Sequence, residues 1–161
     1  MESRTLRAAA AALAVALGAQ ARADPPPLEL ATFPRAALEI VQHAGDSVRR
    51  FHFDVWVADT PARSEQGLMY VRDLPPDRGM VFPFAPARVV SFWMKNTYIP
   101  LDLLFITAGG RVAKITARAP PLRLDLLSSD VPVAAVLELR GGEAGLLGIR
   151  VGDRVSWKPV R

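Results

Sequence analysis

Short apolar segments separated by turn-forming residues run through this sequence, and they constrain its fold more than any other feature. Between Val48 and Val57, Phe51 and Phe53 belong to an apolar series that alternates with charged or polar residues. A period of two is typical of a strand with one buried face. The near-continuous apolar run from Leu101 to Thr107 instead indicates a strand at the centre of a sheet.

The whole pattern predicts about eight short strands at fairly even spacing, without an internal repeat. Thr60 followed by Pro61 predicts the start of one short helix, because threonine caps free N–H groups and proline suits the first helical position. This helix should end between Gly67 and Tyr70. We therefore expect a mainly β fold, a compact β-sandwich or partly closed barrel, rather than regularly alternating strands and helices.

The first 23 residues have the layout of a secretory signal peptide. Two arginines precede an uncharged run of 12 residues, Ala8–Ala19, and residues 21–23 (Ala-Arg-Ala) place small side chains at the −3 and −1 positions of a cleavage site. A transmembrane anchor would need about 20 apolar residues. We therefore expect cleavage after Ala23, a periplasmic or secreted protein, and no stable membrane anchor after cleavage.

Three segments are expected along the chain: the signal peptide at 1–23, an extended proline-rich leader at 24–36, and a single β domain at 37–161. Pro25-Pro26-Pro27 excludes a helix or a central strand from the leader, because proline lacks an N–H group and fixes φ. The 138 residues that would remain after cleavage are enough to bury one substantial core.

Composition excludes several kinds of chemistry. The chain has no cysteine, so it is not a lipoprotein and has neither a disulfide nor a thiol nucleophile. Two histidines without thiols make an N/S-ligated zinc site improbable, and the phosphate- and dinucleotide-binding motifs are absent. Cleavage after residue 23 would leave 17 basic and 15 acidic residues. The arginines are scattered instead of clustered on one face, so no nucleic-acid partner is expected.

A series of motifs gives the chain its identity: Val-Ala-Asp-Thr-Pro (57–61), Gln-Gly-Leu-Met-Tyr (66–70), Leu-Pro-Pro-Asp-Arg-Gly-Met-Val-Phe (74–82), Ser-Phe-Trp-Met-Lys-Asn-Thr-Tyr-Ile-Pro-Leu-Asp (91–102) and Leu-Gly-Ile-Arg-Val-Gly-Asp-Arg-Val (147–155). Together they resemble the domain of unknown function 192 (DUF192) family over roughly residues 48–157. The resemblance implies a compact β-sandwich that is often exported. It implies no particular reaction and no catalytic residues.

The strand expected at Val89–Lys95 carries the residues best suited to binding. Alternate residues of a strand share a face, so Trp93 and Lys95 should lie together on the face opposite Met94. An exposed indole can stack on a ligand while nearby ammonium and amide groups fix its orientation. We therefore predict a site for a small polar or anionic molecule, formed by Arg78, Trp93, Lys95, Asn96 and Asp102.

The same residues allow two other interpretations. In one, Trp93 covers the end of the sandwich, and Lys95 pairs with Asp102 to stabilise the fold. In the other, the protein is an enzyme in which Lys95 and Asp102 form a proton-transfer pair, which requires partial burial in a cleft and a perturbed pKa. Among functions, we favour an exported binding or accessory module of the cell envelope over an enzyme.

Met69, Met80 and Met94, the only methionines apart from the initiator, all fall inside the motifs. Thioethers are soft ligands that suit Cu(I), and a tryptophan face can cover such a cation. Methionine is also a common core residue, and Met94 and Trp93 should point to opposite faces of their strand. Core packing is the favoured interpretation, so we expect no cofactor and keep Cu(I) as the alternative.

Overall fold

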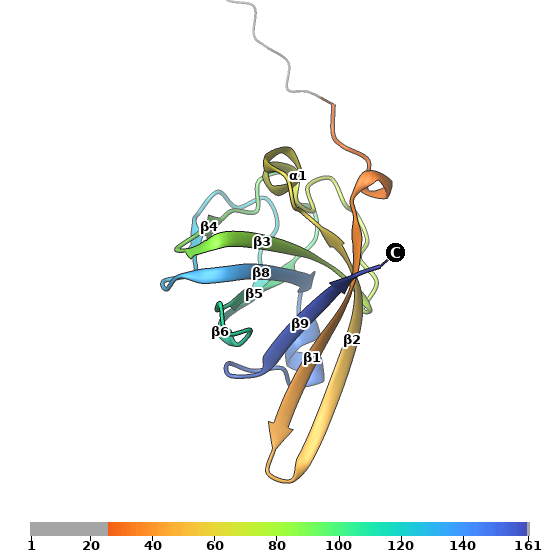
Figure 1. Ribbon diagram of the computed structural model, residues 1–161. Coiled ribbons are helices and arrows are strands. Elements are labelled where there is room, and N and C mark those ends of the chain that lie inside the picture. Colours follow the sequence, from red (N-terminus) through yellow and green to blue (C-terminus); the bar gives the residue numbers. More distant parts are fainter. Residues whose placement is uncertain (1–25, 161) are drawn as a thin grey trace, which may run out of the picture.

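The computed structural model describes residues 26–160 (Figure 1). Its elements, in chain order, are η1 (Leu30–Thr32), β1 (Arg35–Ala44), β2 (Ser47–Val57), α1 (Pro61–Gln66), β3 (Arg78–Arg88), β4 (Ser91–Phe92), β5 (Leu101–Ile106), β6 (Val112–Ala119), β7 (Leu127–Ser128), β8 (Val133–Arg140), α2 (Glu143–Leu147) and β9 (Arg154–Pro159). Seven strands form one sheet in the order β6-β5-β8-β3-β2-β1-β9, and β4 pairs with β7. The expected signal peptide at 1–23 lies outside the described residues.

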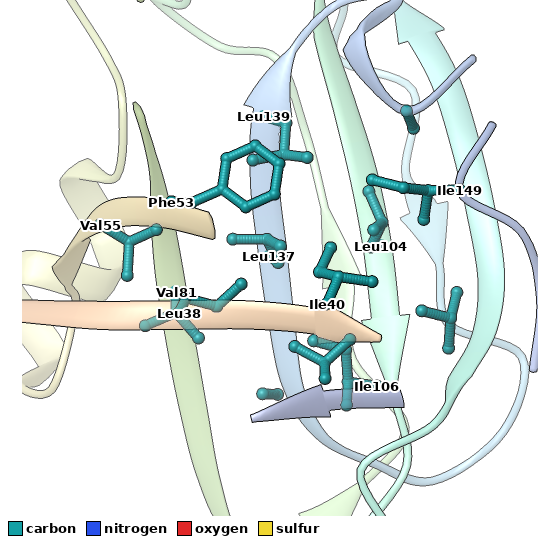
Figure 2. Close-up of a cluster of buried hydrophobic side chains, with 14 of the residues drawn as sticks. Leu38, Ile40, Phe53, Val55, Val81, Leu104, Ile106, Leu137, Leu139 and Ile149 are labelled. Atoms are coloured by element: carbon teal, nitrogen blue, oxygen red, sulfur yellow. The ribbon is translucent and has the colours of Figure 1, made fainter. Parts of the chain in front are cut away.

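The seven-stranded sheet curls around an apolar interior but does not close, so the expectation of a mainly β fold with a partly closed barrel is confirmed. Figure 2 shows this inner core, in which Leu38, Phe53, Val81, Leu104 and Leu137 from five different strands face one another. Near one end, an isolated bridge between Arg111 and Arg154 brings the segment before β6 against β9. The two edges of the sheet therefore approach each other there.

β1 and β2 form a long antiparallel hairpin. β1 begins at Arg35, two residues before the expected start of the domain, and β1 and β2 pair continuously until Ala44 lies opposite Ser47. Only Gly45 and Asp46 form the turn, with Gly45 at a φ of 59°, a conformation that glycine adopts without strain. The predicted alternation is confirmed, since Phe53 is 4% exposed and the neighbouring His52 is exposed.

One pair of neighbouring strands in the seven-stranded sheet is parallel, whereas the other pairs are antiparallel. β2 runs through α1 to β3, and β3 pairs with β2 in parallel. α1 begins as predicted, because the Thr60 side chain accepts a hydrogen bond from the Arg63 N–H and Pro61 takes the first helical position. Gly67 ends the helix with a φ of 52°. None of the helices among residues 26–160 is long and apolar enough to span a membrane.

A second apolar cluster lies on the outer face of the sheet. Met80 and Phe82 of β3, Leu103 of β5 and Val136 of β8 belong to it, so these three strands are buried on both faces. The prediction of a central strand at Leu101–Thr107 is confirmed, since every residue of β5 is buried. α1, the β4–β7 pair and their connecting loops lie over this face, and this covering layer leaves room for the cavities described next.

Candidate functional site

A cavity of about 420 Å³ lies between the end of α1 and strands β3 and β4. Its walls combine apolar rings and polar groups: Phe84, Phe92 and Trp93 contribute aromatic surface, and Ser91 and Arg88 contribute polar atoms. α1 ends at this wall because Gly67 breaks the helix, and the chain then continues into Leu68 and Met69, which also line the cavity. Helix, strand and loop thus meet around one space that is partly open to solvent.

Glu138 of β8 also lines this cavity and lies deep within it. The register of the sheet places Glu138 opposite Met80 of β3 and opposite Leu103 of β5, and both of these neighbours are fully buried. Only 5% of Glu138 is exposed. Its Oε2 atom is buried without a hydrogen-bond partner, and none of the ion pairs among residues 26–160 includes this carboxyl.

Burial raises the pKa of Glu138 to about 8, because the surrounding apolar side chains solvate a charged carboxylate poorly. At neutral pH the side chain is therefore mainly a neutral carboxylic acid. Perturbed acids that line a cavity are candidates for a functional group, since a purely structural carboxyl is normally paired.

Gly67 keeps the space above this carboxyl free. A Cβ atom at position 67 would lie 3.2 Å from the Phe82 ring and 4.0 Å from Oε2 of Glu138. Its positive φ also disfavours any larger residue. The helix end is thus shaped so that the approach to Glu138 is not filled by a side chain.

A smaller cavity of about 290 Å³ adjoins the first and contains three of the five predicted ligand residues, Trp93, Lys95 and Asn96. The Lys95 Nζ atom lies 5.2 Å from the centre of the Trp93 ring, and the Asn96 side chain donates a 3.0 Å hydrogen bond to the Tyr70 hydroxyl. Trp93 is 43% exposed, as predicted from the strand pattern, although β4 itself covers only Ser91 and Phe92. Trp93 and Met69 line both cavities.

One wall of the smaller cavity comes from the leader at 26–28. The Gln66 side chain donates to the Leu28 carbonyl and accepts from the Leu28 N–H group, so it holds the leader against the end of α1. The leader is therefore part of the site and contains the short helical turn η1 as well as extended residues.

Arg78 and Asp102 do not line either cavity. Because β3 pairs in parallel with β2, Arg78 lies opposite Asp54, to which it forms a 3.2 Å ion pair, and it also lies over the Trp56 ring. The expectation that Arg78 and Asp102 share a pocket with Trp93 and Lys95 is therefore corrected by the topology of the sheet.

Asp102 has a different set of partners from the one expected. It is fully buried, and its carboxylate accepts hydrogen bonds from the N–H groups of Arg118 (2.7 Å), Gly142 (2.8 Å) and Ala144 (2.9 Å). Gly142 precedes α2 and has no side chain to cap it, so Asp102 caps this helix from a neighbouring strand. The three backbone donors give Asp102 a structural role.

The methionines are divided between the core and the cavity. Met80 and Met94 are buried in the outer apolar cluster, whereas Met69 is half-buried and lines both cavities. Within residues 26–160, no three histidine, aspartate or glutamate side chains gather as they would around a metal ion.

Sequence reasoning did not select Glu138, although a signal was present. It is the one charged residue in the segment Ala134–Leu139, whose apolar pattern predicts a strand. A lone carboxyl in a strand that is buried on both faces has to find a partner or a cavity.

Comparison with known proteins agrees with the motifs. The sequence model of the DUF192 family, described as Uncharacterized ACR, matches residues 40–157. A solved structure from Sinorhizobium meliloti 1021, described as a proposed transcription regulator, is 40% identical, with a TM-score of 0.74 over 78% of this chain and 95% of the other. A protein of unknown function from Novosphingobium aromaticivorans DSM 12444 is 36% identical, with a TM-score of 0.75 over 84% and 94%. No curated protein matches the chain.

Proposed function

The chain belongs to the DUF192 family, and we propose that it is an exported binding module of the cell envelope that holds a small polar molecule in the cavity beside α1. The observation that carries this proposal is the buried carboxyl of Glu138, which has no partner at Oε2 and lines that cavity. Export rests on the signal-peptide pattern of residues 1–23.

An unpaired buried carboxyl is costly for a protein that has no use for it. Leaving a buried polar group without a hydrogen bond costs about 1–3 kcal/mol, whereas an apolar side chain of similar size would pack against Met80 and Leu103 without that loss. Glu138 therefore has the properties of a group whose partner arrives from outside the chain.

The rest of the cavity suits a small molecule. Its volume lies within the range of about 300–1,000 Å³ that is typical of ligand pockets. Such pockets are mostly apolar with a few polar groups, and here aromatic side chains line the cavity together with the carboxyl. Trp93 joins this cavity to the smaller one, where Lys95 can contact an acidic substituent of the ligand.

A binding module is better supported than the enzyme considered from the sequence. That enzyme required Asp102 to exchange a proton with Lys95, but both oxygens of Asp102 already accept backbone N–H groups. Glu138 has no second carboxyl or histidine among the cavity residues except the exposed Glu65.

Ligand-observed NMR on the mature protein with mixtures of sugars, amino acids, nucleotides and short peptides tests the proposal. Ser91 is exposed and lines the cavity, so Ser91→Trp should fill the space and abolish the signals of the compounds that bind. Ser47→Trp, at the far hairpin, is the matched control and should leave them unchanged. If no compound binds, or if both variants bind as the wild type does, the cavity is not a ligand site.

A further inference from the structure

We propose that the ligand of the 420 Å³ cavity, if the proposed function holds, is an organic cation whose N–H groups donate hydrogen bonds to the Glu138 carboxylate. Protonated primary amines and amidines are the chemical class. The inference starts from the acceptor that the protein leaves free, since Oε2 of Glu138 is buried and bonded to no donor among residues 26–160.

Among residues 26–160, no positively charged side chain forms an ion pair with this carboxyl. Met80 and Phe82 of β3 and Leu103 of β5, which pack around it, carry no charge. Besides Glu138, the charged side chains that line the cavity are Glu65 of α1 and Arg88 of β3, and both are exposed. An anionic ligand group could accept only a hydrogen bond from the neutral acid, whereas a cationic group would complete an ion pair with the carboxylate.

The aromatic rings that line the cavity also favour a positively charged ligand. Phe84, Phe92 and Trp93 line the cavity, and the face of an aromatic ring attracts a cation. The Arg88 guanidinium already lies 4.8 Å from the centre of the Phe84 ring, so this surface binds a cation within the protein itself. Hydrogen bonds between a cation and a carboxylate are roughly twice as strong as neutral ones. A protonated amine should therefore bind more tightly than an alcohol of the same shape.

Binding of a cation to Glu138 should release the proton of this carboxylic acid. Burial raises the pKa of Glu138 to about 8, so the empty site holds a neutral acid at pH 7. When a protonated amine binds, the Glu138 proton leaves to solvent and an ammonium–carboxylate pair remains. Below pH 8 the affinity should therefore rise as pH increases, by up to about tenfold per unit, and one proton should be released for each ligand bound.

Three probes of nearly equal shape test this inference: benzylamine, benzyl alcohol and benzoate. Calorimetry and ligand-observed NMR at pH 6, 7 and 8 would compare wild type with Glu138→Gln and with Glu39→Gln, a control on the distant strand β1. We expect benzylamine to bind wild type at least about tenfold tighter than the other two, and Glu138→Gln to lose this preference together with the pH dependence.

Equal binding of the three probes, or benzylamine binding that survives in Glu138→Gln, would overturn the inference while leaving the cavity as a ligand site. Failure of all three probes, together with no hits in the mixtures above, would remove the proposed function as well. Proton release by the wild type, measured in two buffers of different ionisation enthalpy, tests the same point even if the variant does not fold. Absence of release would count against the cation.

Discussion

Asp102 and Glu138 lie on the neighbouring strands β5 and β8, and both carboxyl groups are almost completely buried. The Asp102 carboxylate accepts three backbone N–H groups, whereas Oε2 of Glu138 has no partner. The same functional group therefore accepts backbone hydrogen bonds at one position and has an unpaired oxygen at the other. Hydrogen bonding distinguishes the two carboxyls, since their degree of burial is nearly the same.

Asp102→Ala should destabilise the protein strongly, because it leaves three backbone donors without an acceptor and uncaps α2. We expect a loss of about 3 kcal/mol or more in the free energy of unfolding, measured by urea denaturation. Asp125→Ala, in an exposed ion pair with Arg123, should change it by less than about 0.5 kcal/mol. A similar small effect at Asp102 would show that its hydrogen bonds do not support the fold.

Glu138 should make the protein less stable as pH rises. Its pKa is about 8 in the folded state, against an ordinary value of 4.5, so the folded protein keeps a proton that the unfolded chain releases. Because the unfolded state binds fewer protons between these values, the stability falls from pH 4.5 to pH 8, by roughly 3–5 kcal/mol. Glu138→Gln has no titratable carboxyl at this position, so its stability should not show this dependence on pH.

Urea denaturation of wild type and Glu138→Gln at several pH values measures this effect. The variant should gain stability relative to wild type as pH rises toward 8, and the difference should level off outside that window. A constant difference between the two proteins would mean that Glu138 titrates normally.

At the scale of residues, periodicity predicted part of the site. Alternation along the segment Val89–Lys95 placed Trp93 outward beside Lys95, and the structure brings both together with Asn96. Arg78 could not be placed in the same way, because its position depends on which strand lies beside β3. Pairing between distant strands is not encoded in local periodicity.

At the scale of elements, the alternation of β2 leads to a direct test. Phe53 lies in the inner core with Leu38 and Leu137, so Phe53→Ala should cost about 3–5 kcal/mol in the free energy of unfolding. His52→Ala, on the exposed face, should cost little. Urea denaturation compares the two, and equal losses would contradict the register between β1 and β2.

Most strands and the first helix could be predicted from local sequence signals, whereas the pairing between strands could not. Thr60 and Pro61 predicted α1 because capping depends on adjacent residues. The parallel pairing of β2 with β3 was not expected, because the sheet is otherwise antiparallel and the helix in the connection between these strands has only six residues. The pairing of β7 with β4 involves only two residues of each strand, which leaves too little sequence pattern to identify a strand.

For the whole molecule, the sequence pattern predicts export and processing. Expressed in a Gram-negative host, the protein should appear in the periplasmic fraction with Asp24 as its first residue, because residues 21–23 form a cleavage site after an apolar run. Intact-mass analysis of that fraction measures this. A membrane-bound species that retains Met1 would instead identify the segment as an anchor.

The pairing of β9 with β1 has a consequence for the time at which the protein folds. Ile40 lies opposite Val155, so one of the first strands receives its second neighbour only when almost the entire chain is available. Contacts over such long separations make folding slow. A chain truncated before Arg154 would lose the pairing of β9 with β1 and the Val155 side chain of the inner core, so it should lack a cooperative thermal transition by circular dichroism. In an exported protein, this late completion would keep the emerging chain unfolded until its last residues have crossed the membrane.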